Sequence, residues 1–296
     1  MEDPCRDADA MPLDCCLDPA GDMQQEVDRK LQALNQMRVS CSLLANMLHL
    51  WLEAHKLGCA PSLQHFFFHQ GCVHPALKLK SLINVTVADV SEIFFEEIAL
   101  MPEVTVRFAG DAVLGCTYVP SHIQYMIQEM LKNAIVLDVE RRRRLGLPEK
   151  NTDCNSPGPV GEGTRLEVLR HDDSLCLVVV DTGEGLPNPH VWSYGYSGWA
   201  NAGESELSPD NRDVGTIDYP AWHKRLAGGG VGLPMLKMYA ELFGGEAGEL
   251  QNLPDTFRRL MSDDISQQNA RHGGVYVAIP ASDDAQENEQ AFAAVR

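Results

Sequence analysis

The sequence contains no run of 18 apolar residues, no CxxC pair and no GxxxxGK[ST] phosphate-binding loop. The first absence excludes a conventional transmembrane helix, because about 20 apolar residues are needed to cross a bilayer. Without CxxC pairs, the nine cysteines predict neither a zinc site nor a disulfide framework. The third absence excludes nucleotide binding by a P-loop.

Basic residues are also scarce, since 24 Lys and Arg face 42 Asp and Glu and give a formal net charge of −18. A charge of this sign repels phosphate backbones and anionic lipid, so we predict that the partner is neither nucleic acid nor a membrane surface. The first twenty residues are acidic and interrupted by proline, unlike a secretory signal or an Arg-rich transit peptide. The 44% of hydrophobic residues nevertheless suffices for a folded core.

Apolar periodicity divides the chain into a helical part and a mixed part. Residues 27–51 carry apolar side chains at spacings of three and four, which predicts a long amphipathic helix packed in a bundle. Thr86 and Asp89 resemble a capping box, so we expect a second helix from there to Pro102. At 296 residues the chain has room for two domains. We expect a disordered polar tail over 1–22, a helical domain over 23–102, a second domain over 103–282 and a C-terminal tail over 283–296.

The second domain has the alternation typical of strands as well as helical segments. We predict strands at 104–108, 116–119, 164–170, 174–180 and 274–279, and helices at 121–143 and 233–243. The first of these helices has Met126, Met130, Ala134 and Leu137 as its buried face. The segment from about 58 to Asn84 is predicted to be irregular. The fold class is therefore α+β, with helices covering one face of a mixed sheet.

Four segments carry the polar and glycine residues of a candidate site: EMLKNA at 129–134, DTGEG at 181–185, GGGVGLP at 228–234 and HGGVYVAI at 272–279. Glu129 and Asn133 are four residues apart on a helix and so share one face. Asn133 offers Mg²⁺ a neutral oxygen ligand, and Glu129 can accept a proton from an attacking hydroxyl. Taken alone, this pair also fits an ordinary solvent-exposed helix face.

The other segments strengthen the nucleotide interpretation. Asp181 follows an apolar strand, and its carboxylate can accept a hydrogen bond from an exocyclic amine such as that of adenine. Gly228, Gly230 and Gly232 lead directly into a helix, where free backbone amides suit phosphate. Dinucleotide binding of the Rossmann type is disfavoured, because this glycine run follows a late loop and not an initial strand. A lone DxGxG is also a common surface turn, so the prediction depends on all four segments together.

The order of these segments resembles the ATP-binding fold shared by sensor histidine kinases, type II topoisomerases, mismatch-repair ATPases and the large heat-shock chaperone. More narrowly, VPSHIQYMIQEMLKNA at 119–134, YGYSG at 194–198 and LAGGGVGLPMLKMYAELFGG at 226–245 resemble the mitochondrial kinases of the pyruvate and branched-chain 2-oxoacid dehydrogenase complexes. The similarity covers about residues 30–280. It implies a partial N-terminal helical bundle, without the family's first half, followed by an α/β sandwich ATP-binding domain.

The resemblance also implies a serine/threonine protein kinase that uses ATP and Mg²⁺, with Glu129 as the base, Asn133 on the metal and Asp181 on adenine. Its substrate would be the decarboxylase subunit of a 2-oxoacid dehydrogenase complex in the mitochondrial matrix. The lipoyl-bearing acyltransferase core and a second copy of the chain would be further partners. Other positions that line the nucleotide site in the family are Lys132, Gly183, Gly185, Ser197, Gly198, Gly228, Gly230, Gly232 and Leu233.

Several residues depart from the family pattern and leave an alternative open. Tyr125 stands where pyruvate-directed members carry a histidine, and His122 lies on the same helix face about 10 Å away, where we expect a capping-turn or surface histidine. Val136 replaces a nearby arginine, and Gly198 and Gly274 replace hydroxyl residues. A nucleotide-binding pseudokinase or regulatory module is therefore the second hypothesis. A histidine autokinase is disfavoured, because none of the ten histidines has the expected sequence context.

Overall fold

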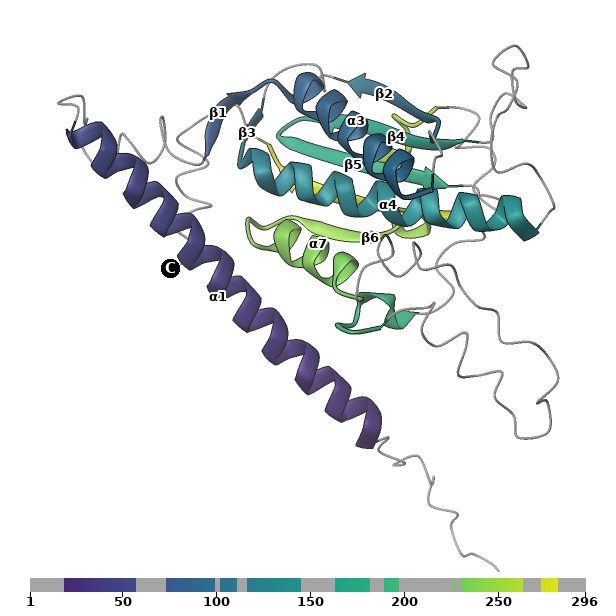
Figure 1. Cartoon of the computed structure of the whole chain (residues 1–296), viewed down its shortest axis with the longest axis horizontal. Helices are drawn as coiled ribbons and strands as arrows, with labels where there is room; N and C mark the ends of the chain where they lie inside the picture. The colour runs from purple at the N-terminus through teal and green to yellow at the C-terminus, as the bar shows by residue number, and fades with distance from the viewer. Residues whose placement is uncertain are drawn as a thin grey trace, which may run out of the picture.

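The computed structural model describes residues 19–56, 73–98, 102–110, 116–144, 163–181, 189–196, 226, 230–262 and 273–281. The first part contains α1 (Pro19–Lys56), β1 (His74–Leu77) and α3 (Leu79–Ile98) (Figure 1). There follow β2 (Val104–Gly110), β3 (Cys116–Tyr118), α4 (Pro120–Arg144), β4 (Thr164–His171), β5 (Ser174–Asp181) and the 3-10 helix η1 (Pro189–Trp192). The last elements are α7 (Gly232–Glu241), β6 (Glu246–Glu249), the 3-10 helix η2 (Leu250–Asn252), α8 (Asp255–Arg258) and β7 (Gly273–Pro280).

A five-stranded mixed sheet with the order β2-β4-β5-β7-β6 forms the centre of the molecule. β2 runs parallel to β4, and the other neighbouring pairs are antiparallel. The β4–β5 hairpin turns at Asp172, which has a φ of 49°, a left-handed conformation that aspartate tolerates better than most residues. β1 and β3 form a separate antiparallel pair. The predicted α+β class with a mixed sheet is confirmed.

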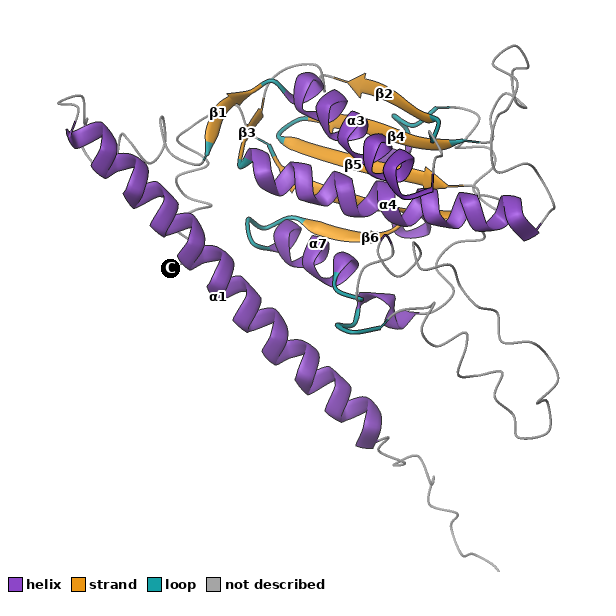
Figure 2. Cartoon of the chain, viewed as in Figure 1, coloured by secondary structure: helices purple, strands orange, loops and turns teal. Residues whose placement is uncertain are grey.

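Two hydrophobic cores lie on opposite faces of this sheet. In β5, Leu177 and Val179 face the larger core, which the helices α3, α4 and α7 complete (Figure 2). Cys176 and Val178 point the other way, into a smaller core closed by residues 250–261. β5 is apolar along most of its length because both of its faces are covered. The prediction of helices on one face is correct, and the segment 250–261 covers the second face.

An ion pair between a buried glutamate and a partly exposed arginine connects β2 and β4 on the second face. The Glu167 side chain on β4 is 2% exposed, and its Oε2 lies 2.5 Å from Nε of Arg107 on β2. Ser262 Oγ donates to the other carboxylate oxygen at 3.2 Å, and Arg107 also donates to the Leu260 carbonyl. The buried carboxylate is therefore compensated by a charged partner and a hydroxyl, as buried charges require.

Some local predictions fail for identifiable reasons. Thr86 is not a cap, because α3 begins at Leu79 and Thr86 Oγ1 donates to the Leu82 carbonyl one turn earlier. The region predicted to be irregular up to Asn84 contains β1 and the start of α3. β6, η2 and α8 were not predicted; with three or four residues each, they are too short to show a clear period.

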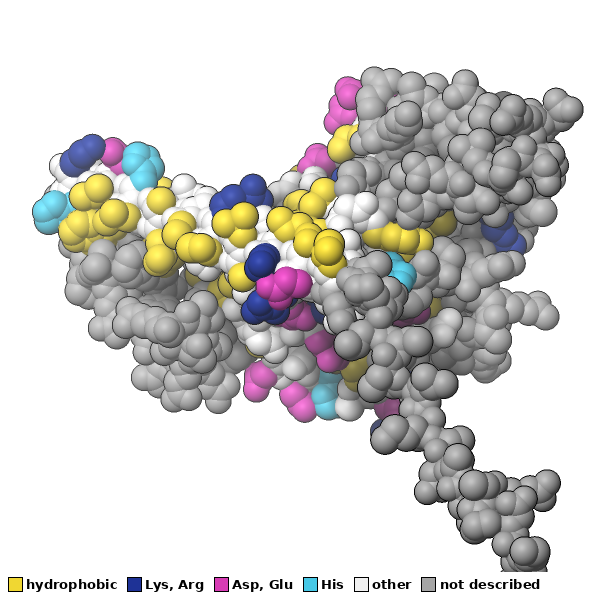
Figure 3. Space-filling model, turned by 90° about the horizontal axis from the view of Figure 1, so that it is seen from below, with side chains coloured by type: hydrophobic (Ala, Val, Ile, Leu, Met, Phe, Trp, Pro, Cys, Tyr) yellow, Lys and Arg dark blue, Asp and Glu magenta, His cyan; other side chains and the backbone are white. Residues whose placement is uncertain are grey.

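The long helix predicted near the N-terminus is confirmed as α1, but its predicted core face is confirmed only in part: Met47 is buried and Leu31 packs against the larger core. Val27, Leu34, Met37, Leu44 and Leu48, here called the outer stripe, are between 42% and 60% exposed. Their hydrophobic side chains are visible along the helix in Figure 3. The expectation that this stripe is buried is therefore wrong. Within the described ranges, no helix is long and apolar enough to cross a membrane.

The packing of α3 on α4 gives a direct test with a matched control. Phe94 is fully buried in the larger core, whereas its neighbour Phe95 is 54% exposed. We expect Phe94→Ala to lower the free energy of unfolding by about 3–5 kcal/mol, through lost burial and a cavity. Phe95→Ala should change it by no more than about 0.5 kcal/mol. Urea denaturation measures both, and equal effects would contradict the described orientation of α3.

Candidate nucleotide site

Helix α4 presents a polar edge that contains two of the predicted site residues in direct contact. The Glu129 side chain is 14% exposed, and its Oε1 lies 2.5 Å from Lys132 Nζ. Asn133, one turn after Glu129, is partly exposed. Met130 and Ala134 between and after them are buried against the sheet, as predicted. The apolar face therefore fixes the helix, and the carboxylate, ammonium and amide remain along its edge.

The first residue of α7 lies directly beside this carboxylate. A Cβ atom at Gly232 would overlap Oε2 of Glu129. A larger residue at 232 would therefore require the Glu129 carboxylate to move, and glycine leaves it in place. The structure thus brings the last glycine of the predicted phosphate-binding run together with the predicted base.

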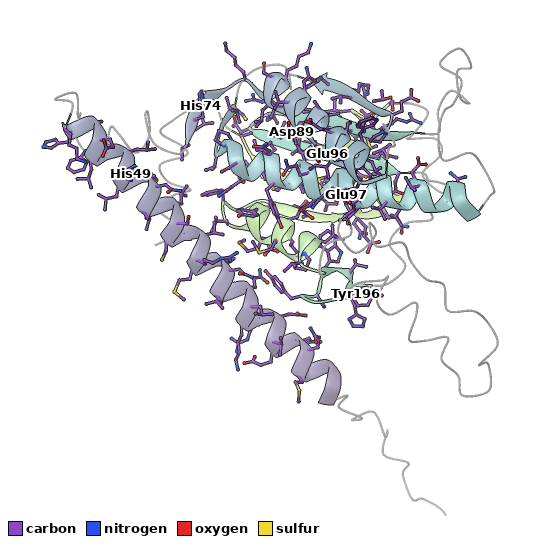
Figure 4. All side chains as sticks on the ribbon, in the orientation of Figure 1. His49, His74, Asp89, Glu96, Glu97 and Tyr196 are labelled. Carbon is purple, nitrogen blue, oxygen red and sulfur yellow. The ribbon has the colours of Figure 1, made fainter. Side chains whose placement is uncertain are left out.

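A second close backbone contact lies just before α7. Gly230 has a φ of 70°, and a Cβ there would lie 2.5 Å from the carbonyl oxygen of Tyr196. The Gly195 amide donates to the Gly230 carbonyl at 2.9 Å. Residues 193–196, here called the 193–196 turn, thus lie at the N-terminal end of α7. Tyr196, the last residue of this turn, is labelled in Figure 4. Glycine is required at 230 both for its left-handed φ and for this approach.

Asp181 is the last residue of β5 and is 6% exposed. Its register partner across the sheet is Gly273, at the start of β7. The next residue, Gly274, has a φ of 153°, and a Cβ there would overlap the Val179 carbonyl oxygen. This approach gives a local reason for the glycine at 274, where the resembled family has a hydroxyl residue.

The remaining predicted residues fall into two groups. Leu233 is partly buried and packs against the larger core. Gly183, Gly185, Ser197, Gly198 and Gly228 lie outside the described residues. Sequence reasoning missed one contribution, from α1: the Asp28 carboxylate accepts a hydrogen bond from the Tyr194 amide at 3.0 Å. The only local signal was a series of polar residues four positions apart on that helix.

An aromatic cluster joins α4 to α7 next to the site. His122 is 6% exposed, with its ring 4.5 Å from that of Tyr239 and 5.8 Å from that of Phe243. The expectation of a surface histidine is therefore wrong, although His122 does lie in the first turn of α4. Tyr125 also packs against Tyr239, with ring centroids 5.0 Å apart and the rings tilted by 53°. Burial, and then the Glu129 carboxylate, raise the pKa of Tyr125, so its hydroxyl stays neutral beside the predicted base.

The resemblance implies that the site binds ATP and Mg²⁺. No cluster of three His, Cys, Asp or Glu side chains that could hold a metal ion occurs within the described part of the chain. A single amide oxygen, such as that of Asn133, still fits Mg²⁺, which keeps waters and takes further ligands from substrate phosphates. Val136 is 1% exposed inside the larger core, so no cation from this position reaches the site.

The buried histidine predicts a pH dependence of stability. Burial lowers the pKa of His122 from 6.5 to about 4, and its Nδ1 has no hydrogen-bond partner among the described residues. Between pH 6.5 and about pH 4 the unfolded state binds more protons than the folded state. The free energy of unfolding should therefore fall as the pH falls, by roughly 1–2 kcal/mol from pH 7 to pH 5. In His122→Phe this part of the dependence should vanish. Urea denaturation of the variant and the wild type at pH 7 and pH 5 measures this dependence. If the free energy of unfolding changed equally with pH in both proteins, the burial of this ring would be contradicted.

The chain is similar in sequence to several known proteins. No family model matches the chain. It is 27% identical over 179 residues to the mitochondrial pyruvate dehydrogenase (acetyl-transferring) kinase of Arabidopsis thaliana, which covers 60% of this chain and 43% of the plant protein. It is 24% identical over 240 residues to kinase isozyme 4 of Mus musculus, covering 78% of this chain and 49% of the mouse protein. The chain thus spans less than half the length of these relatives. These matches confirm the predicted resemblance: the chain is a relative of the mitochondrial pyruvate dehydrogenase kinases.

Proposed function

We propose that the protein is an ATP-dependent serine/threonine protein kinase that acts on the decarboxylase subunit of a mitochondrial 2-oxoacid dehydrogenase complex. The observation that carries the proposal is the approach of Gly232, at the start of α7, to the Glu129 carboxylate. It puts a candidate base beside a helix N-terminus suited to phosphate. The names of the relatives support a kinase and a mitochondrial location.

In the proposed reaction, Glu129 orients the serine hydroxyl of the substrate and accepts its proton. The ion pair with Lys132 holds the carboxylate in one orientation. The backbone amides at the start of α7, at the positive end of the helix dipole, favour the negative charge of phosphate. Phosphoryl transfer needs mainly such positioning and charge stabilisation. Mg²⁺ bound to Asn133 would add positive charge at the phosphates.

The adenine end of the site is assigned to Asp181, whose carboxylate would accept a hydrogen bond from the purine amino group. Gly183, Gly185, Ser197, Gly198 and Gly228 are proposed to complete the site on the basis of the resemblance. A second copy of the chain and the lipoyl-bearing acyltransferase core are proposed as partners, and the matrix as the location, on the same basis.

A second candidate function is nucleotide binding without phosphoryl transfer. Two observations favour it: Val136 is buried and apolar, so its position supplies no cation near Asn133, and a neutral Tyr125 stands next to Glu129. Without a neighbouring histidine to tune its proton affinity, Glu129 would accept the substrate proton less readily, and phosphate transfer would be slower. In this case the protein would act as a regulatory module that binds ATP.

The base assignment predicts a separation of binding from catalysis. Glu129→Gln keeps the shape of the side chain but removes its ability to take a proton, so phosphate transfer should fall by a factor on the order of 100 or more. The dissociation constant for Mg·ATP should change by less than about threefold. Labelled phosphate incorporation into purified decarboxylase subunit and calorimetric titration measure these quantities.

Glu96→Gln provides the control, because this exposed carboxylate on α3 undergoes the same chemical change away from the site. Unaltered transfer in Glu129→Gln would refute the base assignment. A wild-type protein that binds ATP but transfers no phosphate to either the pyruvate or the branched-chain substrate would establish the regulatory alternative.

The adenine assignment predicts discrimination between nucleotides that differ only at the purine amino group. ATP should bind the wild-type protein about tenfold more tightly than purine riboside triphosphate, which lacks this donor and leaves the Asp181 carboxylate without it. Competitive calorimetric titration measures the ratio, and GTP serves as the control with a different purine edge. Equal affinities for ATP and purine riboside triphosphate would refute the assignment of Asp181 to the adenine amino group.

A further inference from the structure

The face of α1 that lies against the body of the protein is partly polar: Val39 is buried in the larger core and Leu31 and Leu43 pack against it, and polar residues share this face. Gln24, Asp28, Gln32 and Asn35 follow one another at spacings of four, four and three, and so form one ridge along the helix. Each of them has a polar contact with a residue beyond α1. A helix that served only to cover a core would present mainly apolar side chains here. In α1 several of the apolar side chains lie on the exposed outer stripe (Figure 3).

Asp28 is the residue of this ridge that holds the 193–196 turn. Its Oδ1 accepts a hydrogen bond from the backbone amide of Tyr194 at 3.0 Å and another from Gln24 Nε2 at 3.0 Å. Gln24 Nε2 also approaches the Tyr194 carbonyl at 3.5 Å. Both main-chain polar groups of Tyr194 are therefore engaged by α1, from a position 166 residues earlier in the chain.

The Tyr194 side chain anchors the same turn to α7. It is 8% exposed, and its hydroxyl lies 3.9 Å from the sulfur of Met235 and hydrogen-bonds with Asn35. Gln32 Nε2 donates to Glu241 Oε2 at the far end of α7, at 2.7 Å. The ridge thus contacts both the turn and the helix that form two sides of the candidate site.

The contact continues through the backbone to the predicted base. The residue after Tyr194 is Gly195, whose amide donates to the Gly230 carbonyl at 2.9 Å. The backbones of Gly230 and the turn also lie close together, because a Cβ at Gly230 would overlap the Tyr196 carbonyl oxygen. Two residues later, Gly232 lies against the Glu129 carboxylate. A displacement of the Tyr194 amide would therefore shift the start of α7 relative to Glu129.

We propose that Asp28 is a positioning residue of the nucleotide site: it fixes the 193–196 turn, and through that turn the glycines that precede and begin α7. This inference deepens the proposed function and depends on nucleotide binding at Gly230 and Gly232. Asp28 does not touch the nucleotide; it sets the geometry of the backbone that does. The N-terminal helix is accordingly part of the site and not only an adjoining element.

The test compares three substitutions on one helix. Asp28→Ala removes the acceptor, and the dissociation constant for Mg·ATP should rise about tenfold, the effect of one lost charge-assisted hydrogen bond. Asp28→Asn keeps an oxygen acceptor and should restore most of the affinity. Glu26→Ala is the matched control and should bind as wild type does, since among the described residues Glu26 pairs with Arg29 and Lys30 of its own helix. Calorimetric titration well below the melting temperature, with Tm recorded without ligand, separates this effect from a general loss of stability.

Amide hydrogen exchange tests the same inference without nucleotide. In Asp28→Ala the amides of Tyr194 and Gly195 should exchange at least about tenfold faster, while those of the central strand β5 keep their wild-type rates. If Asp28→Ala does not fold, Gln24→Ala, at a largely exposed position, should give a smaller change in the same direction. Wild-type affinity together with unchanged exchange at these two amides would overturn the proposal. If the wild-type protein binds no adenine nucleotide, the proposed function fails, and the exchange rates still decide whether Asp28 holds the turn.

Discussion

The approach of the α7 backbone to the Glu129 carboxylate is the constraint on which the rest of the site depends. Glu129 and Gly232 lie 103 positions apart in sequence, and their contact exists only because α4 and α7 pack side by side on the same face of the sheet. The aromatic cluster of His122 and Tyr125 against Tyr239 fixes this packing. The cluster holds a histidine nitrogen that has no hydrogen-bond partner in the described part of the chain, and contacts between the rings and the burial of apolar area must offset this cost.

The sheet supports this contact from both sides. The larger core holds α4 and α7 in place, and the smaller core with the Arg107–Glu167 pair holds the opposite face. β5 passes between the two cores and ends at Asp181. A rigid central strand with a carboxylate at its end is well suited to orient a flat ring, because the position of the carboxylate is set by packing on two faces.

Sequence periodicity predicted the elements whose own residues decide their structure. The apolar face of α4 and the continuous apolar run of β5 are local properties, and both are where the sequence places them. The same period in α1 identified which residues share a face, but it carries no information on whether anything covers that face. Thr86 shows a related limit: the same side chain caps a helix or bonds back within one, and only the position of Leu79 decides. The contact between Asp28 and Tyr194 joins segments with no local relation, so no pattern could have predicted it.

The outer stripe of α1 allows binding events on this helix to be coupled to binding elsewhere in the protein. The helix has 38 residues and is therefore about 57 Å long, with the exposed apolar side chains of the outer stripe on one side and its hydrogen bonds to the rest of the chain on the other. Any ligand that favours one placement of α1 must alter the binding of every other ligand that depends on that placement. Such couplings are reciprocal, so both ligands would experience the same factor. A detergent or a neighbouring protein that binds the outer stripe and favours one placement of α1 would then alter nucleotide binding at the candidate site without touching it.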